Sequence, residues 1–404
     1  MQRLVFCERA ANVPRMHDFD AIRPYRDEEV PAVVGRWRDD ARIVDGAARL
    51  VTPGLARIAP WLARGLTRAA IGWKSRRFQS IEDFQRFLSH YFAQLLKDTV
   101  SGLTVSGLDQ LDPDRAYLYI SNHRDIVMDT GLIYYSVHKA GFDTPEAAVG
   151  DNLFTDPLAT DLMRLNKSFV IERSVEGKRA IYRALTRTSH YIRDTLERDH
   201  SVWIAQREGR SKDGFDRTEP ALLKMLALAW RKDAESFGAL LERMPLVPVS
   251  ISYELDPCDG RKAHELAVID REGGYEKADD EDLTSIIEGM TGFKGRVHLH
   301  YSTPLQGEFE SAEDLATALD KAIVGGLKVF PTQAEAARIL DLGNVPDAGP
   351  WLPEVKAAFD EHLAACPEAE RPFLLAGYGN LIRNRTELGI DASVQTDSAE
   401  TVLL

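Results

Sequence analysis

A histidine followed by two carboxylates is the part of this sequence best suited to chemistry. His123 comes directly after a short β-type run at 117–120, and Asp125 and Asp129 follow it at the start of an apolar, helix-like segment. A strand-to-helix turn holds the backbone of such a histidine and exposes its ring, while a nearby carboxylate can fix the imidazole tautomer. This arrangement is typical of a general base that takes a proton from an alcohol. The alternative is a solvent-facing loop histidine beside ordinary helix-start acids.

Three further strand ends carry reactive groups. A buried strand at 168–172 ends at Arg173, where a guanidinium can form a bidentate pair with a phosphate. An apolar strand at 246–253 ends in the polar residue Glu254. The strand at 201–206 ends in a Glu-Gly turn rich in cations, where glycine lets the backbone approach a ligand closely. The residues of this turn are Arg207, Glu208, Gly209, Arg210, Lys212 and Gly214.

Length and composition indicate a globular protein with two domains, or one large domain with helical additions. The chain has 404 residues, of which 44% are hydrophobic and 28% charged. Its net charge of −13 argues against nucleic acid as the main partner. Cys7, Cys258 and Cys366 lie far apart without metal-ligand spacing. We therefore expect neither a disulfide framework nor a zinc site, and a reducing compartment is favoured.

The N-terminal part contains a basic amphipathic segment. The first residues lack the apolar core of a signal peptide, and no uninterrupted apolar run is long enough to span a bilayer, so any membrane contact should be peripheral. Residues 55–79 carry six cations and no acid, together with Trp61 and Trp73, and a helix should begin at Pro60. Such a helix suits an anionic membrane surface. The alternative is a helix packed on the protein's own core with a solvated basic face.

Alternating strand-like and helical runs between about residues 100 and 305 predict an α/β fold. We expect a mixed sheet covered by helices, with helical additions at both ends of the chain. The expected strands are 102–107, 117–121, 168–172, 201–206, 246–253, 265–270 and 296–301. The expected helices are 27–39, 60–79, 81–99, 129–140, 177–198, 219–243, 311–325, 332–342 and 351–364.

The order of the four reactive segments resembles the glycerolipid acyltransferase family, which includes glycerol-3-phosphate and lysophosphatidic acid acyltransferases. That family has a His-x4-Asp block, a strand ending in Arg, a Glu-Gly block and a Val-Pro strand. The similar segments here are Asn122-His123 with Asp129, 169–173, 208–211 and 247–249. Five residues separate His123 from Asp129, which leaves Asp125 open as the partner, although Asp129 matches the family's aspartate. The residues of the first block, Asn-His-Arg-Asp-Ile at 122–126, and of the third, Gln-Arg-Glu-Gly-Arg at 206–210, are similar to those of a bacterial branch of the family.

The resemblance implies transfer of a fatty acyl group from a thioester, either acyl-CoA or acyl carrier protein, to a hydroxyl of a glycerol phosphate or lysophospholipid. His123 would act as general base oriented by Asp129, and the alkoxide would attack the thioester carbonyl without a cofactor or a metal. Cations of the other blocks would hold the acceptor's phosphate. The substrate-binding residues would be Asn122, Arg124, Arg173, Arg207, Glu208, Gly209, Arg210 and Lys212.

The implied partners are an acyl thioester, a phosphate-bearing glycerolipid and an anionic membrane surface, with the protein in the cytoplasm on the inner face of the cell membrane. Two other functions stay open: a lipid-binding protein with a disabled dyad, and a hydrolase in which water replaces the alcohol at His123. The expected regions are an N-terminal helical region at 1–100, an acyltransferase α/β domain at 101–305, a C-terminal helical region at 306–390 and a flexible tail at 391–404.

Overall fold

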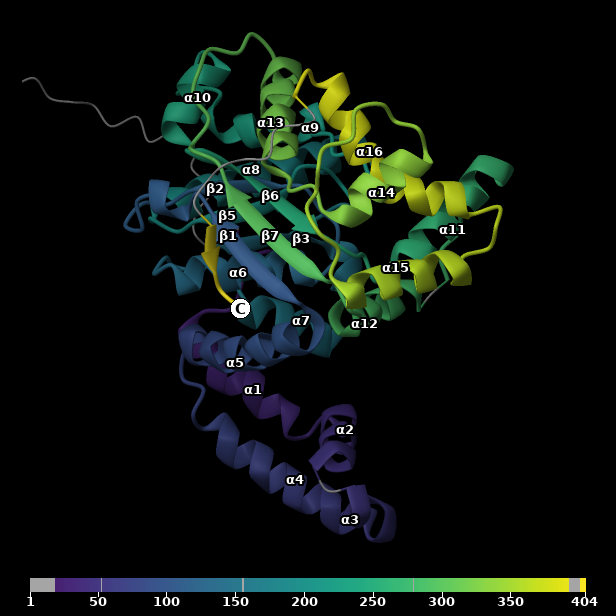
Figure 1. Ribbon diagram of the computed structural model, residues 1–404. Helices are drawn as coiled ribbons and strands as arrows, with labels where there is room; N and C mark the ends of the chain where they lie inside the picture. The colour runs from purple at the N-terminus through teal and green to yellow at the C-terminus, as the bar shows by residue number, and fades with distance from the viewer. Residues whose placement is uncertain (1–18, 52, 155, 279, 392–399) are drawn as a thin grey trace, which may run out of the picture.

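A mixed β-sheet lies at the centre of the protein (Figure 1). This computed structural model describes residues 19–51, 53–154, 156–278, 280–391 and 400–404. Within those ranges eight strands form one sheet in the order β4-β3-β5-β2-β6-β7-β1-β8. The strands from β4 to β6 are parallel, β7 is antiparallel to β6, β1 is parallel to β7, and β8 is antiparallel to β1. The strands are β1 (Gly102–Ser106), β2 (Leu118–Ser121), β3 (Glu146–Gly150), β4 (Ser168–Ile171), β5 (Val202–Ala205), β6 (Leu246–Tyr253), β7 (Arg296–Tyr301) and β8 (Glu400–Val402).

The central strands are apolar because helices cover both of their faces. Every residue of β2 and β6 is buried, as expected for the middle of a covered parallel sheet. Ser121 at the end of β2 pairs in register with Ala205 of β5 and Val249 of β6. The residues that follow β2 and β5 therefore meet at one edge of the sheet, and β6 runs on beside them.

Helices lie above and below the sheet in Figure 1. On one face α5 and α6 contribute Leu96, Met128 and Leu132 to a core that includes Tyr119 of β2. On the other face α8, α9 and α13 contribute a second core, which includes Tyr191. These helices are α5 (Ile81–Thr99), α6 (Met128–Lys139), α7 (Pro157–Leu165), α8 (Lys178–Glu197), α9 (Pro220–Leu226), α10 (Phe237–Arg243) and α13 (Ala312–Gly326). The predicted α/β class with a mixed sheet is confirmed.

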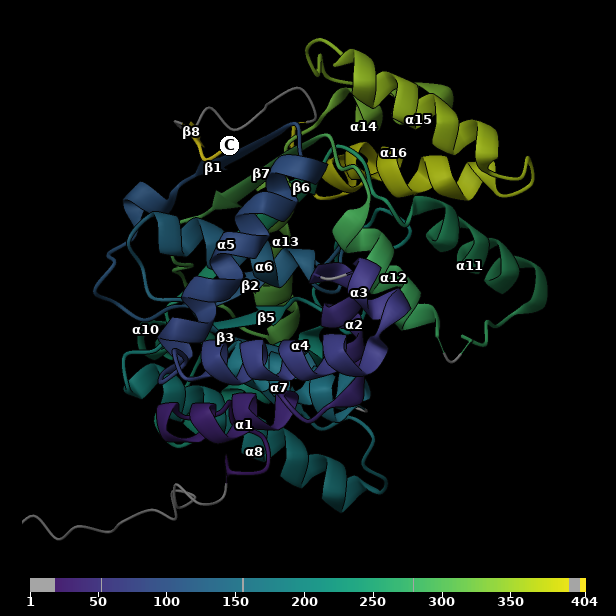
Figure 2. The ribbon, with the colours of Figure 1, turned by 90° about the horizontal axis from the view of Figure 1, so that it is seen from below.

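Helices α2 to α4 form an arm that projects away from the sheet on the side of α5 (Figure 1), and Figure 2 views the molecule from the side of this arm. The N-terminal helices are α1 (Val30–Trp37), α2 (Ala41–Val51), α3 (Pro53–Ile58) and α4 (Pro60–Ser75). As predicted, α4 begins at Pro60, where the missing N–H costs no helical hydrogen bond. Helix α4 packs against α1 and α2. Its buried residues are the small Ala63 and Thr67, whereas Trp61 is 74% exposed and Trp73 is 58% exposed.

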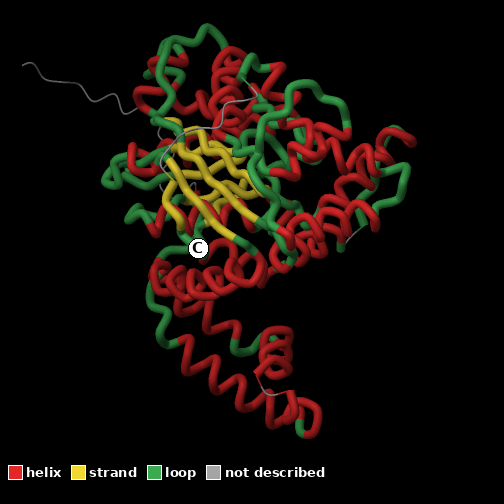
Figure 3. Tube along the Cα trace, viewed as in Figure 1, coloured by secondary structure: helices red, strands yellow, loops and turns green. Residues whose placement is uncertain are grey.

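A bundle of C-terminal helices covers the far end of β6 (Figure 1). Figure 3 shows helices in red and strands in yellow in the same view. Its core brings Phe359, Leu374 and Tyr378 against Ala263 of α11. The C-terminal helices are α14 (Pro331–Ile339), α15 (Pro353–Ala365) and α16 (Arg371–Glu387); α11 (Asp259–Glu272) packs against α16, and α12 (Glu281–Thr291) contacts α5. Helix α11, which lies between β6 and β7 in the chain, therefore ties the C-terminal helices to the α/β domain.

Two expectations within the α/β domain were wrong. The strand expected at 265–270 is part of α11, where Ala263 and Ala267 are buried one helical turn apart. The helix expected at 219–243 is interrupted: a 3-10 turn follows α9, and α10 starts only after Ser236, whose hydroxyl accepts a hydrogen bond from Ala239 N. Strand β3 was not predicted, because its small residues give little strand signal.

The end of the chain also differs from expectation. Strands were expected to stop before residue 304, yet β8 adds Glu400–Val402 to β1. Residues 392–399 of the expected flexible tail lie outside the described residues. No helix in the described ranges combines the length and the apolarity needed to cross a bilayer.

Candidate active site

The turn after β2 is locked to the neighbouring strand by Asn122. Its side-chain amide donates to the carbonyl of Ile251 at 2.9 Å and accepts from the N–H of Ile251 at 2.8 Å. Asn122 is fully buried, so its amide holds β6 and does not face the cavity. The carbonyl of His123 accepts a hydrogen bond from Ser211 N at 2.8 Å. These bonds fix the backbone that presents the His123 ring.

His123 and Asp129 form a hydrogen-bonded pair. Nδ1 of His123 lies 2.7 Å from Oδ2 of Asp129, and the ring stands edge-on to Trp203 with centroids 6.0 Å apart. With Asp129 ionised, Nδ1 carries the hydrogen and donates it, which leaves Nε2 free to accept a proton. This is the tautomer that a general base requires.

Asp129 is held from several directions. It is fully buried, and Oδ2 also accepts from Arg124 N at 2.6 Å and from Asp125 N at 3.0 Å. Oδ1 accepts from the Tyr253 hydroxyl at 2.7 Å. A buried carboxylate keeps its charge only where donors surround it, and Asp129 has four of them.

Asp125, the other possible partner, does a different task. Its Oδ1 accepts from Val127 N at 2.9 Å and Met128 N at 2.8 Å, at the start of α6. Burial, followed by the nearby charge of Asp129, raises the pKa of the Asp125 carboxyl. The structure therefore brings Asp129, and not Asp125, to His123.

A cavity of about 380 Å³ opens in front of His123. Six of the predicted substrate-binding residues line it. They are Arg173, Arg207, Glu208, Gly209, Arg210 and Lys212. The other two predicted residues, Asn122 and Arg124, do not line this cavity. Other walls come from residues that the sequence did not single out. These are, among others, Asn152, Leu153, Trp203, Glu265, Leu266 and Ile269.

The cations of the cavity divide into two groups. Arg173 lies 3.2 Å from Glu208, Lys212 pairs with Glu265, and the pKa of Lys212 is lowered by burial. In contrast, Arg207 Nε and Arg210 Nη1 are buried and have no hydrogen-bond partner within the described part of the chain. Buried guanidinium donors without partners are unusual, so these two side chains are suited to an anionic ligand.

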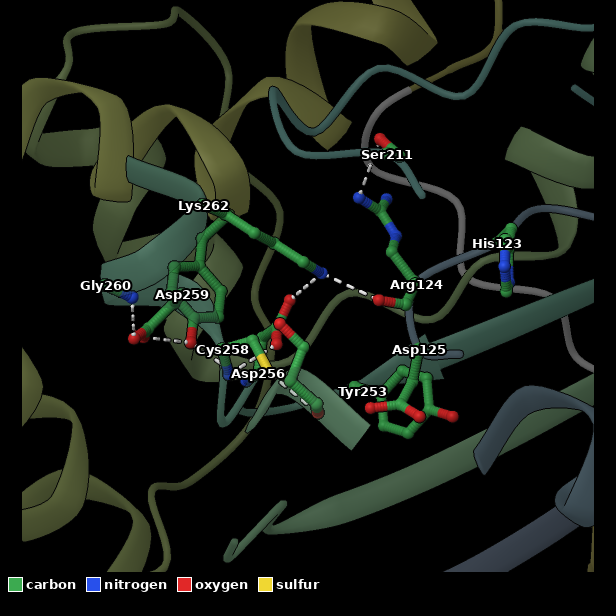
Figure 4. Close-up of polar contacts among 12 residues, drawn as sticks. His123, Arg124, Asp125, Ser211, Tyr253, Asp256, Cys258, Asp259, Gly260 and Lys262 are labelled. Carbon is green, nitrogen blue, oxygen red and sulfur yellow. Dashed lines mark hydrogen bonds and ion pairs between the residues drawn. The ribbon is translucent and has the colours of Figure 1, made fainter. Parts of the chain in front are cut away.

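Arg124 faces away from His123. Its guanidinium donates to Asp216 Oδ2 at 2.6 Å and to Ser211 Oγ at 3.2 Å, and Figure 4 shows it turned toward Ser211. Its carbonyl accepts from Lys262 Nζ at 2.7 Å, and Lys262 also pairs with Asp256 (Figure 4). Lys262 of helix α11 thus holds the backbone carbonyl of the residue that follows His123.

Within the described ranges, the remaining chemical groups are not arranged as a metal or thiol site. Among the described residues, no three His, Cys, Asp or Glu side chains converge so as to hold a metal ion. Cys258 and Cys366 are both free and buried, and neither lines the cavity. Burial raises the pKa of the Cys258 thiol to about 12, so it is not a nucleophile at neutral pH.

Residues 102–252, which include the His123 turn, match the family model described as Acyltransferase. The chain therefore contains an acyltransferase domain, and the protein is an enzyme of this class. Its structure is similar to the crystal structure of the 1-acyl-sn-glycerophosphate (LPA) acyltransferase PlsC from Thermotoga maritima, with 18% sequence identity, a TM-score of 0.36, and coverage of 70% of this chain and 92% of that chain. No curated protein matches the chain in sequence.

Proposed function

We propose that this protein transfers a fatty acyl group from a thioester to a hydroxyl of a phosphate-bearing glycerolipid, with His123 as general base. The observation that carries the proposal is the 2.7 Å bond between His123 Nδ1 and a fully buried Asp129 at the wall of a cationic cavity. The donor is acyl-CoA or an acyl carrier protein, and the reaction uses no resident cofactor.

The acyl group passes from the thioester to the acceptor by addition and elimination at the thioester carbonyl, without an acyl-enzyme intermediate. His123 Nε2 removes the proton of the acceptor hydroxyl as its oxygen attacks the thioester carbonyl, and Asp129 stabilises the imidazolium that forms. The tetrahedral intermediate collapses with cleavage of the C–S bond. The thiolate that leaves takes the proton back from His123, so that the products are an ester and a free thiol.

Arg207 and Arg210 receive the acceptor's phosphate in this proposal. Both line the cavity with His123, and each has a buried donor atom without a partner among the described residues. Arg173 and Lys212 already contact carboxylates, which makes them secondary contacts. Charge-assisted, bidentate bonds are the usual way in which arginine binds phosphate.

The acyl chains have an apolar wall to follow. Ile126, Leu153, Leu266 and Ile269 line the same cavity as the cations, and Ile269 is among the exposed large apolar residues. A polar, cationic side and an apolar side suit a substrate that carries both a phosphate and a fatty chain.

The arm attaches the protein to an anionic membrane surface. The exposed large residues of α3 and α4 are Ile58, Trp61, Leu62, Leu66 and Trp73. Arg77 stacks over Trp73 with its guanidinium carbon 4.3 Å from the ring centroid, and Arg64 pairs with Asp45 at 2.8 Å. Exposed tryptophans and cations on one projecting helix are typical of an interfacial helix. Their exposure disfavours the alternative of an apolar face packed on the protein's own core.

Incubation of the full chain with radiolabelled acyl thioesters and a panel of glycerol phosphate and lysolipid acceptors tests the proposal. Labelled ester should form with a phosphate-bearing acceptor and should disappear in His123→Ala. His138→Ala, an exposed histidine on α6, is the matched control and should keep full activity. Free fatty acid in place of ester would identify a hydrolase, and lipid binding without turnover a lipid-binding protein.

A further inference from the structure

The catalytic carboxylate has a second side-chain partner besides the histidine. The hydroxyl of Tyr253, the last residue of β6, lies 2.7 Å from Oδ1 of Asp129, while Oδ2 faces Nδ1 of His123 at 2.7 Å. Tyr253 is 9% exposed and Asp129 is 0% exposed. The two oxygens of one carboxylate therefore connect β6 to the His123 ring.

Tyr253 fixes an orientation that the other donors do not. Backbone donors from Arg124 and Asp125 reach only Oδ2, so they leave the carboxylate free to tilt about that oxygen. A donor on Oδ1 removes this freedom, because each hydrogen bond restricts the donor-acceptor direction. The rotation of Asp129 in turn sets the direction from which His123 is held.

The negative charges around Asp129 keep the Tyr253 hydroxyl protonated. Asp125 on the same turn, Asp216 on the loop after β5 and Asp256 after β6 all contribute negative charge near the pair. Burial, followed by the charges of Asp129, Asp125 and Asp256, holds the pKa of Tyr253 well above its ordinary value. The hydroxyl therefore stays protonated and can only donate to Asp129.

We propose that Tyr253 is a positioning residue for acyl transfer. It aims the Asp129 carboxylate at Nδ1 of His123 and thereby keeps the imidazole in the tautomer whose Nε2 accepts a proton. Tyr253 does not line the cavity that contains His123, so it acts through Asp129 and not on the substrate. This assigns a task to Tyr253 in the fourth segment of the sequence, whose polar end, Glu254, pairs with Arg296. The inference rests on the proposed function of His123.

Tyr253→Phe tests the proposal, with Tyr301→Phe as the matched control. Tyr301 is a fully buried residue of β7 whose hydroxyl lies 2.7 Å from Ser136 Oγ, away from the dyad. Loss of a hydrogen bond to a charged group should lower kcat of Tyr253→Phe by about ten- to a hundredfold. The KM values for thioester and acceptor should stay within about twofold of wild type. Tyr301→Phe should keep wild-type kcat.

Two further readouts separate positioning from stability. Without the Tyr253 hydroxyl the tilted Asp129 carboxylate stabilises the imidazolium less, so the acid limb of the kcat/KM profile should move to lower pH. In a double-mutant cycle, Tyr253→Phe should cause no further loss in the Asp129→Asn background. An unchanged kcat, equal losses in Tyr253→Phe and Tyr301→Phe, or multiplying effects in the cycle would each overturn the proposal.

The test distinguishes this inference from the function on which it rests. Nitrogen-15 NMR of the His123 ring should show hydrogen on Nδ1 in wild type and a mixture of tautomers in Tyr253→Phe. This pattern without any acyl transfer by the wild-type protein would reject the proposed function and leave the positioning intact. Transfer by wild type with the same single tautomer in both proteins would reject the positioning alone.

Discussion

Nη2 of Arg124 lies 2.6 Å from Oδ2 of Asp216, and this carboxylate is completely enclosed by the protein. The pair joins the residue after His123 to the loop that follows β5. Burial raises the pKa of Asp216, and the charge of Arg124 acts in the opposite direction. Arg124 thus braces two segments of the site, whereas the resemblance implied that it binds substrate.

Removing this brace should destabilise the fold. Arg124→Met leaves a buried charge without its partner, and such a change costs about 3–5 kcal/mol. The free energy of unfolding, measured by urea denaturation, should fall by that amount. Arg217→Met, which breaks the exposed pair with Glu387, should cost less than about 1 kcal/mol. Equal effects of the two substitutions would contradict the assignment of Arg124 as a brace.

Arg207 and Arg210 should govern the affinity for the acceptor. Arg210→Gln or Arg207→Gln removes a charge-assisted hydrogen bond to the acceptor's phosphate, so the KM for the acceptor should rise about tenfold or more. The KM for the thioester should stay near the wild-type value. Arg187→Gln is the control, since Arg187 pairs with Glu172 and does not line the cavity. If the KM for thioester rises as much as that for acceptor, these arginines serve the donor.

The apolar face of the arm should be needed for membrane binding. Combined replacement of Trp61, Leu66 and Trp73 by serine removes exposed apolar surface without touching the buried side of α4. Co-sedimentation with vesicles that contain anionic lipid should drop at least tenfold, since each large apolar side chain contributes about 1.5–3 kcal/mol when buried. Ile339→Ser, an exposed apolar residue of α14, should bind as wild type does. Unchanged binding of the triple variant would show that the arm is not the anchor.

His298 should make the fold sensitive to mild acid. Burial lowers its pKa to about 4, with Glu400 acting in the opposite direction and Lys328 and His300 adding to the shift. Between about pH 6.5 and 4 the unfolded chain therefore binds more protons at this residue than the folded protein, so stability is lost as the pH falls. The loss is at most about 3 kcal/mol. In His298→Asn the urea-unfolding midpoint should depend less on pH over this range than in wild type. An unchanged pH dependence would contradict the assignment.

Local sequence patterns were enough to predict most elements and the strand ends where the chemistry lies. The β2 turn, β4, β5 and β6 follow from apolar runs that end in polar residues, and α5 has the predicted bounds. The small residues of β3 gave no such pattern. The apolar run at 265–270 was misleading, because a buried helix face and a buried strand look alike over six residues.

The hydrogen bonds that hold the site residues in place could not be predicted, since their partners lie far along the chain. Tyr253 reaches Asp129 across 124 residues, and Lys262 reaches Arg124 across 138 residues. No local pattern marks either contact. Likewise, a sequence alone does not show that Glu208 contacts Arg173 or that Arg124 turns toward Asp216, because both depend on how the loop after β5 folds back.

The rate of ester formation by His123→Ala, relative to wild type under saturating thioester and acceptor, tests the central claim most directly. General-base catalysis contributes about 10²–10⁴-fold, so the rate should fall at least a hundredfold. Asp129→Asn should be nearly as damaging and Asp125→Asn milder, because Nδ1 of His123 contacts Asp129. Circular dichroism should show the fold intact in His123→Ala. A loss of less than tenfold in that variant would contradict the assignment of His123 as the general base.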